Sequence, residues 1–245
     1  MKFPNRLAQL LLYRVKLVPV ADCVHYCGFR YGRKEFNPYE QYIDGLTTGV
    51  SRDKLRGELL DFLLHFRPKD LGEALSVGLQ RPPPLWLLPW KRISADTPRG
   101  WRQVASEIPD LLTHFSEEGV PEEMIDQECA WIEGAWSSIE REGYRPEVHS
   151  FIRVFELRGA ERSAYIVADG NHRLSCLSAS GASHVRVILA PLRTAHRANS
   201  AKWPAVRDGR ISQTDALRIF DAYFTGNHQP RLNAVPAALV RAQIR

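Results

Sequence analysis

The sequence predicts an α+β fold in which a small mixed β-sheet carries packed helices and follows a mainly helical N-terminal extension. Three apolar, strand-like runs cover residues 151–157, 163–167 and 184–190, and helical patterns lie between and around them. At 245 residues, with hydrophobic side chains making up 44% of the chain, the protein can bury a sizeable core. We expect the extension to span residues 1–80 and the α+β domain to span residues 81–245.

The first twenty residues, MKFPNRLAQLLLYRVKLVPV, combine a basic start with a short apolar run. Arg14 and Lys16 interrupt this run, which is too short to span a membrane, and no small-residue cleavage site follows it. We expect a helix that packs on its own domain. The alternative is a basic amphipathic helix that contacts a membrane surface.

A second helix of the extension is expected to begin after Ser51, because a serine side chain suits an N-cap. The pair Arg67-Pro68 ends the pattern, since proline disfavours helical geometry in the preceding residue. Four leucines lie on one face of this helix: Leu55, Leu59, Leu60 and Leu63.

The α+β domain is expected to begin with RPPPLWLLPW, residues 81–90, as an extended or strand segment, with a proline-rich ligand for a partner domain as the alternative. A helix is expected over residues 101–115 and a longer one over residues 121–142, with Gly143 as the C-terminal cap. The apolar stripe of the longer helix consists of Ile125, Cys129, Ile132, Trp136 and Ile139.

The strand-like runs 151–157 and 163–167 are separated by the turn RGAER, which predicts a hairpin. The last helix is expected to begin at Ser212, with Asp215 three residues later, and to end at Gly226. Its apolar face consists of Leu217, Phe220 and Phe224.

Charge and cysteine content restrict the classes of function. The formal net charge is +5, from 33 Lys plus Arg against 28 Asp plus Glu, which suits an anionic ligand although no long basic run appears. Four cysteines give no disulfide framework in a chain of this size, and Cys23, His25 and Cys27 lack the second ligand pair of a zinc site. We therefore expect a reduced, cytoplasmic protein.

The segment YIVADGNHRLSCLSASG, residues 165–181, places a polar cluster where a predicted strand passes into a predicted helix. The first turn of a helix presents backbone N–H groups to an anion, and Gly170 lets a ligand approach the backbone closely. Arg173 can bind phosphate oxygens, His172 can carry a proton, and Asp169 can hold Mg²⁺ or orient a hydroxyl nucleophile. These residue types predict a phosphate-binding site where the strand passes into the helix. The alternative is an Asp-Gly turn in which Asp169 only caps the helix.

The motif IVADGNHRL, followed by a helix, Gly181 and HVRVIL, resembles the ParB N-terminal/sulfiredoxin superfamily, in which a strand ends in Asp-Gly-x-His-Arg or a near variant. The resemblance covers about residues 151–190. A wider similarity to ParB-like proteins of polysaccharide-biosynthesis loci includes SRDKLRGELLDFLLHFRP, PLWLLPW and HRANSAKWPAVRDGRISQTDALRIFDAYF. It implies a ParB/sulfiredoxin-like domain with a nucleotide site, because sulfiredoxin uses ATP, ParB proteins use CTP, and free serine kinases of this fold use ADP or ATP.

The resemblance also implies roles for single residues. Asp169 matches an acid of the kinase branch, which is expected to act in catalysis with His172 and to hold Mg²⁺. Arg197 is expected to add positive charge, and Trp203 either stacks on the nucleotide or packs in the core. The expected phosphate contacts are Gly170, Asn171, His172, Arg173 and Arg197. The catalytic base is left open among Glu40, Glu147 and Glu156.

Two departures from the superfamily narrow the expected function. Asn171 stands where sulfiredoxin has its catalytic cysteine, so sulfinic acid reduction is not expected. The Gly-Glu-Arg-Arg motif of chromosome-partitioning ParB and a helix-turn-helix pattern are also missing, so DNA is not expected as a partner. We expect a phosphotransferase that uses Mg²⁺ and ATP, ADP or CTP, and that acts on a hydroxyl of a small molecule or glycan intermediate. The alternatives are a non-catalytic nucleotide-binding or DNA-associated module and an accessory protein of polysaccharide biosynthesis.

Overall fold

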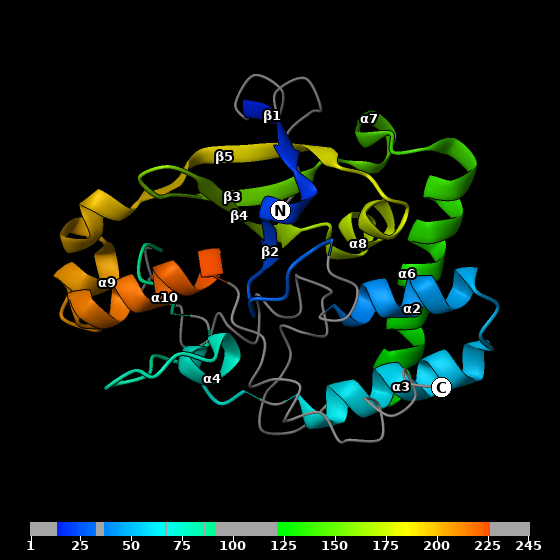
Figure 1. The fold of residues 1–245 in the computed structure, drawn as a ribbon, viewed down its shortest axis with the longest axis horizontal. Helices are drawn as coiled ribbons and strands as arrows, with labels where there is room; N and C mark the ends of the chain where they lie inside the picture. The colour runs from blue at the N-terminus through cyan, green and yellow to red at the C-terminus, as the bar shows by residue number, and fades with distance from the viewer. Residues whose placement is uncertain (1–13, 33–36, 67, 86, 92–121, 226–245) are drawn as a thin grey trace.

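The computed structural model describes residues 14–32, 37–66, 68–85, 87–91 and 122–225. Within these residues the chain forms a mixed α+β fold, built on one five-stranded sheet with helices on both of its faces (Figure 1). The α+β class predicted from the sequence is therefore confirmed. None of the helices in these ranges has the length and apolar character that a bilayer span requires.

The strand order across the sheet is β1-β5-β3-β4-β2, so that β1 and β2 form its two edges. β3 pairs antiparallel with β4 and parallel with β5, while β1 joins β5 antiparallel and β2 joins β4 parallel. The predicted hairpin of β3 and β4 is confirmed. The strands are β1 (Arg14–Pro19), β2 (Cys23–His25), β3 (Ile152–Arg158), β4 (Ser163–Asp169) and β5 (His184–His196).

The expectation of a helical N-terminus is wrong for Arg14–Pro19, which forms β1. Its side chains alternate, so that Val18 enters the core and Lys16 binds the side chains of Tyr165 and Glu156, whereas Leu17 points outward. In its described part the N-terminal extension contains the helices Pro38–Thr47, Arg52–His65 and Leu71–Leu75 besides its strands. It supplies both edge strands of the sheet.

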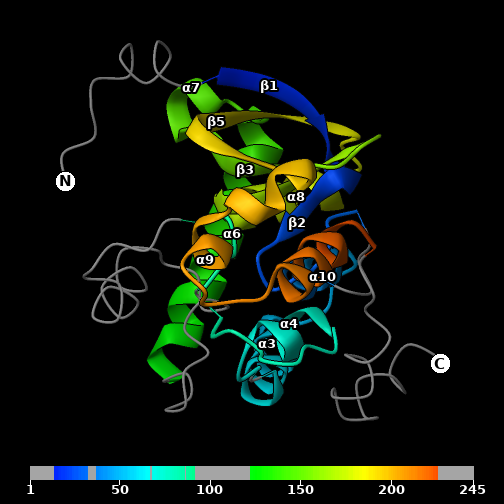
Figure 2. The same cartoon turned by 90° about the vertical axis from the view of Figure 1, so that its left-hand side faces the viewer.

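The helices divide between the two faces of the sheet (Figures 1 and 2). On one face, α8 packs against α6 and α2, and α3 packs against both of these. On the other face, α10 contacts α4, β4 and the turn that leads to α9. The helices are α2 (Pro38–Thr47), α3 (Arg52–His65), α4 (Leu71–Leu75), α6 (Glu122–Glu142), α7 (Pro146–His149), α8 (Asn171–Ala179), α9 (Pro204–Arg207) and α10 (Gln213–Thr225), with 3-10 turns at Val20–Asp22 and Arg197–Lys202.

Each face carries its own apolar cluster, and alternate residues of β4 serve both. Tyr165 and Val167 join the cluster under α8, whereas Ala164 and Ile166 join the cluster under α10. Both clusters combine residues from before and after position 80, such as Ile43 with Ile125 in the first. The described parts of the chain on either side of position 80 therefore share their cores.

Several local predictions are confirmed. The side chains of Ser51 and Ser212 accept hydrogen bonds from the backbone at Lys54 and Asp215, as N-caps do. Gly143, at φ 70°, ends α6, whose predicted stripe is buried except for the partly buried Trp136. The expected helix over residues 101–115 and the end at Gly226 lie outside the described residues.

The proline-rich stretch around residues 81–90 forms no strand in its described part. Its side chains Leu85, Leu87 and Trp90 are nevertheless buried, and Leu87 and Trp90 belong to the apolar cluster under α10. The Trp90 ring contacts the rings of Trp203 and Phe220 edge-on, which fixes this irregular segment against α10.

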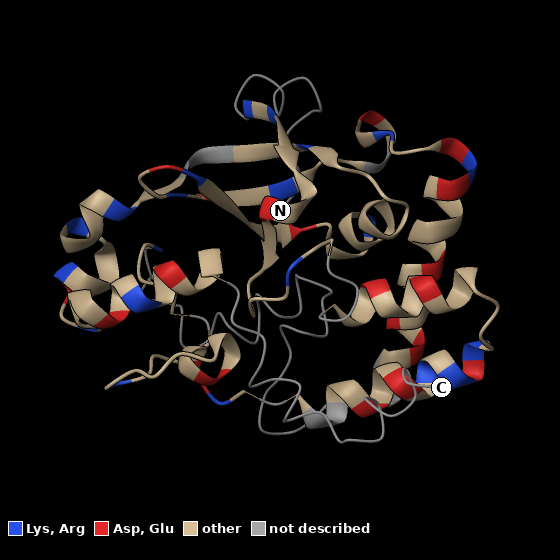
Figure 3. Cartoon of the chain, in the orientation of Figure 1, with Lys and Arg blue, Asp and Glu red and all other residues tan. Residues whose placement is uncertain are grey.

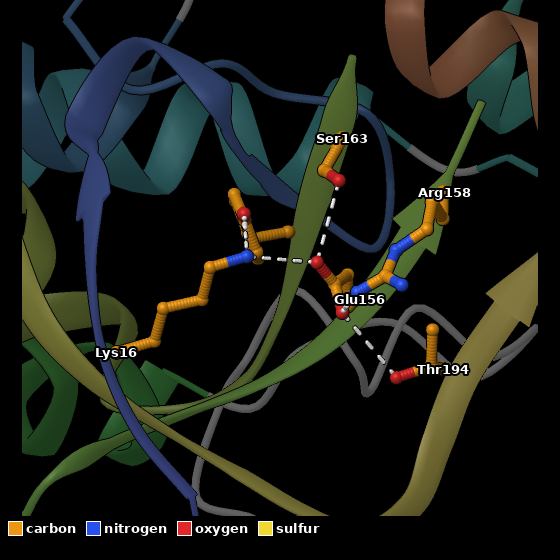
Figure 4. A network of polar contacts seen from close by, with 6 residues as sticks. Lys16, Glu156, Arg158, Ser163 and Thr194 are labelled. Carbon is orange, nitrogen blue, oxygen red and sulfur yellow. Dashed lines mark hydrogen bonds and ion pairs between the residues drawn. The ribbon is translucent and has the colours of Figure 1, made fainter. Parts of the chain in front are cut away.

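A buried carboxylate connects four strands, β1, β3, β4 and β5, at one end of the sheet (Figure 4). Glu156 of β3 is 2% exposed, and its Oε1 accepts hydrogen bonds from Lys16 at 2.9 Å and Ser163 at 3.3 Å. Its Oε2 accepts from Arg158 at 3.0 Å and Thr194 at 3.4 Å. Burial raises the pKa of Glu156, but the hydrogen bonds and charges of Lys16 and Arg158 outweigh burial, so that the pKa lies below its usual value.

We expect Glu156→Gln to lower the free energy of unfolding by about 2 kcal/mol near neutral pH, because Lys16 and Arg158 then lose the charge they face. A carboxylate whose pKa is lowered by folding stabilises the protein above its unfolded pKa, and this contribution disappears as the pH falls through the folded value. Urea unfolding at several pH values, from about pH 7 to about pH 3, should therefore show the two proteins converging in acid.

Glu147→Gln is the matched control. Glu147 also pairs with an arginine, but it is exposed, and exposed ion pairs contribute little to stability. A difference between wild type and Glu156→Gln that stays constant with pH would contradict the assigned role of the charge.

Candidate functional site

The polar cluster lies where β4 passes into α8, as the sequence predicts. Asp169 is the last residue of β4, and Gly170 precedes α8 in the left-handed conformation, at φ 93° and ψ 28°. A Cβ atom on Gly170 would lie 3.0 Å from Cγ1 of Ile152 and 3.0 Å from Nη2 of Arg173. Both the backbone conformation and the close packing therefore require glycine at this position.

A shift in strand register turns Asp169 toward an arginine of the neighbouring strand. Val154 pairs with Val167, but Arg153 pairs with Asp169, so that Ala168 is an extra residue on β4. Oδ2 of Asp169 accepts a hydrogen bond from Nε of Arg153 at 3.1 Å, and its Oδ1 lies 3.7 Å from Nη2 of Arg173. One half-exposed carboxylate thus lies between two guanidinium groups.

Arg173 also fixes the chain that enters β3. Its Nη1 donates a hydrogen bond to the backbone oxygen of Ser150. Ser150 has φ 67° and ψ 155°, a conformation that L-residues rarely adopt and that costs about 1–3 kcal/mol. The guanidinium therefore helps to hold a strained turn directly beside the start of α8.

His172 is held by a buried acid that the sequence analysis missed. Nε2 of His172 lies 2.6 Å from Oε1 of Glu128, a fully buried residue of α6. Within the described part of the chain, the second carboxylate oxygen of Glu128 has no hydrogen-bond partner. The rings of Tyr39 and Trp131 lie 5.1 Å and 6.3 Å from the imidazole.

The sequence does contain a signal for Glu128. This residue follows Ile125 by three positions and precedes Ile132 by four, so it lies on the buried stripe of a predicted amphipathic helix. An acid at such a position requires a polar partner inside the protein. The sequence does not identify that partner.

The loop after β2 packs against α8 through further polar contacts. Tyr31 donates a hydrogen bond of 2.6 Å from its hydroxyl to Oδ1 of Asn171. The backbone N–H of Gly32 contacts Ser178 Oγ at 2.7 Å and Glu40 Oε1 at 2.9 Å. Asn171 and Glu40 thus connect this loop, α2 and the first turn of α8.

The other candidates lie in separate contacts. Arg197 binds both carboxylate oxygens of Asp221 on α10, each at 2.8 Å, on the opposite side of the sheet from α8 (Figure 1). Glu147 pairs with Arg186 at the surface, and Glu156 belongs to the network of Figure 4. Trp203 is buried and stacks on Phe220, as expected for a core residue.

The cysteines are buried thiols in the described structure. Burial raises the pKa of Cys23 and raises that of Cys176 to about 12, so both stay protonated near neutral pH. His25 accepts a hydrogen bond at Nδ1 from the backbone of Cys27. The described residues contain no group of three or more His, Cys, Asp or Glu side chains arranged to hold a metal ion.

A surface hollow of about 580 Å³ lies between the end of α2, the start of α3 and the middle of α6. Its lining includes Thr47, Arg52, Glu133, Trp136 and Glu140, and none of the predicted site residues contributes to it. The hollow is therefore distinct from the start of α8.

Comparisons with protein-family models, with curated proteins and with solved structures find no match to this chain. The resemblance to the ParB N-terminal/sulfiredoxin superfamily accordingly depends on the motif in the sequence.

We expect Gly170→Ala to lower the free energy of unfolding by about 1–3 kcal/mol, because a side chain there is strained and meets Ile152. Gly134→Ala is the matched control: this glycine lies inside α6, and a Cβ atom on it meets nothing within 4 Å. The control should raise stability by about 0.5–1 kcal/mol, as alanine does in helices. Urea unfolding of both variants tests the pair, and equal effects would contradict the described turn.

Proposed function

We propose that this protein is a nucleotide-dependent phosphotransferase that acts on a hydroxyl group of a small molecule or glycan intermediate. The observation that carries the proposal is the turn from β4 into α8, which gathers two arginines, an aspartate and a histidine–glutamate pair around one glycine. The resemblance of the motif to the ParB N-terminal/sulfiredoxin superfamily supports the same function. Phosphoryl transfer depends mainly on positioning and on charge neutralisation, for which these groups are suited.

The phosphates of the nucleotide are proposed to bind at the first turn of α8. Gly170 provides no side chain to cap this helix, and the helix dipole favours an anion at its first turn. Arg153 and Arg173 supply positive charge on either side of Asp169. Both can exchange part of their contact with Asp169 for phosphate oxygens, to which guanidinium groups bind strongly.

His172 is proposed to accept the proton of the acceptor hydroxyl. When Glu128 is ionised it can only accept a hydrogen bond, so Nε2 of His172 carries a hydrogen and the basic nitrogen of the neutral ring is Nδ1. The acceptor oxygen then forms a bond to the terminal phosphorus, and the bond from that phosphorus to the bridging oxygen breaks. The products are a phosphate ester and the shortened nucleotide, and the proton passes through His172 to solvent.

Magnesium fits this site only as a companion of the nucleotide. Mg²⁺ is commonly bound through one or two carboxylates together with substrate phosphates, and Asp169 is a half-exposed carboxylate at the proposed position of the phosphates. Asp169 would therefore hold the ion. Bound there, the ion would supply neutralisation of phosphate charge.

Nucleotide binding is tested first by thermal unfolding with ATP, ADP, CTP and GTP, each with and without Mg²⁺. A nucleotide at about 100 times its Kd should stabilise the protein by about 2.7 kcal/mol. Arg173→Gln should abolish the shift caused by the nucleotide, measured against the variant's own ligand-free protein. Arg197→Gln should keep it, because Arg197 pairs with Asp221 away from α8. The absence of a shift with all four nucleotides would overturn the proposal.

Transfer is tested separately with Glu128→Gln. This variant should keep the nucleotide-induced shift but lose about 100-fold or more of the turnover toward any acceptor found in a screen, because the base is no longer supported. Glu133→Gln on the same helix is the control, since Glu133 contacts Tyr42 and Arg52 instead. Nucleotide binding without transfer to any acceptor would favour the non-catalytic module.

A further inference from the structure

The hollow between α2, α3 and α6 has an apolar floor. These three helices pack on one another at the same side of the molecule (Figure 1). Leu46, Val50 and Trp136 line the hollow, are partly buried and pack against the apolar cluster under α8. At about 580 Å³, the hollow falls within the size range of small-molecule sites. We call it the α2/α6 hollow.

An arginine at the rim of the hollow is held in place from the core. Tyr42, which is 3% exposed, donates a hydrogen bond of 2.8 Å from its hydroxyl to Oε1 of Glu133. Oε2 of Glu133 in turn accepts a hydrogen bond of 2.8 Å from Nε of Arg52. Within the described residues, the terminal N–H groups of Arg52 have no hydrogen-bond partner. The rim therefore offers fixed donors to a ligand.

The rim also offers acceptors, on one face of α6. Glu140 lies seven residues after Glu133, two helical turns along the same face, and Trp136 lies between them. Glu140 is exposed, and no described residue pairs with its carboxylate. Figure 3 shows acidic residues along α6 and charges of both signs at the start of α3. An indole ring is thus flanked by carboxylates and faces a guanidinium.

The mixture of donors and acceptors selects the class of ligand. An anion has only acceptors and would face the carboxylates of Glu133 and Glu140, whereas a cation has only donors and would face Arg52. A hydroxyl group both donates and accepts, so it can satisfy both kinds of rim group. A sugar ring carries such hydroxyls at its edge and apolar C–H groups on its face, which suits the indole of the floor.

We propose that the α2/α6 hollow binds an uncharged saccharide. The sugar ring lies against Trp136, its hydroxyls donate to Glu133 and Glu140, and they accept from Arg52. Trp136 follows Glu128 by eight residues on α6, which separates the hollow from the histidine-bound acid by about 12 Å along the helix axis. Saccharide binding is therefore independent of the phosphoryl transfer proposed for the start of α8, and both sites can be filled together.

Isothermal titration calorimetry of the full chain tests the proposal with maltose, cellobiose and N,N′-diacetylchitobiose. At least one of these sugars should bind, and added NaCl should leave its Kd unchanged, because salt screens charges and the ligand has none. Glu140→Gln should raise the Kd about tenfold, since a carboxylate accepts stronger hydrogen bonds than an amide. Trp136→Leu should raise it by about tenfold or more, through loss of the indole face.

Trp131→Leu is the matched control, because Trp131 is an exposed tryptophan of the same helix that does not line the hollow. It should bind the sugar like the wild type. Trp136 packs on the core, so its variant can lose binding by unfolding; Glu140→Gln changes an exposed residue and gives the decisive result. Wild-type affinity in Glu140→Gln, or equal losses in the two tryptophan variants, would overturn the proposal.

Charged probes separate the saccharide from other occupants. Spermidine and pyrophosphate should not bind in the hollow. Binding of either one that is weakened by NaCl and by Glu140→Gln or Arg52→Gln, without binding of any of the three sugars, would assign the hollow to a charged ligand and overturn the proposal. The absence of binding by all three sugars would overturn it as well. Arg173→Gln should bind the sugar normally, and Glu140→Gln should keep the nucleotide-induced thermal shift, so each site fails separately.

Discussion

The pairing of Arg153 with Asp169 is the interaction on which the candidate site depends. Side chains alternate along a strand, so without the extra residue Ala168 the Asp169 side chain would point to the face that carries Val167. The register shift turns it toward Arg153 on the other face. Asp169 also reaches toward Arg173 of α8, and Arg173 holds Ser150 at the entry to β3. One inserted residue thereby joins a strand end, a helix start and a strained turn.

Burial distinguishes the histidine–glutamate pair from the arginine–aspartate group. Glu128 of α6 is buried where α6 packs on α8. Its hydrogen bond with His172 is therefore shielded from water and restricts the imidazole to one orientation. Asp169 and its arginines are partly exposed and can exchange partners with an incoming anion. The start of α8 therefore combines a histidine held in one orientation with arginines that can exchange partners. A site that first binds a ligand and then reacts with it needs both kinds of group.

Local signals predicted the elements whose contacts are local. The hairpin of β3 and β4, the stripe of α6 and the caps at Ser51 and Ser212 depend on neighbours in sequence, and each is readable there. β1 was predicted as a helix because its partner, β5, lies far along the chain and its pattern is only six residues long. The junction at Gly170 could be predicted from its residue types. The contact of His172 with Glu128 could not, because it depends on how α6 packs on α8.

The two edge strands also determine the order in which the molecule can assemble. Val18 pairs with Val185 and Val24 with Ile166, so both strands from the start of the chain find their partners only in its second half. Closing such long loops costs chain entropy before the strand pairings stabilise the chain. Pairings between distant segments therefore slow folding. On the ribosome, the residues of β1 and β2 are synthesised before β4 and β5, so they cannot pair until those strands have been made. The apolar side chains of β1 consequently stay exposed until β5 has been synthesised, and a chaperone is able to bind them during that time.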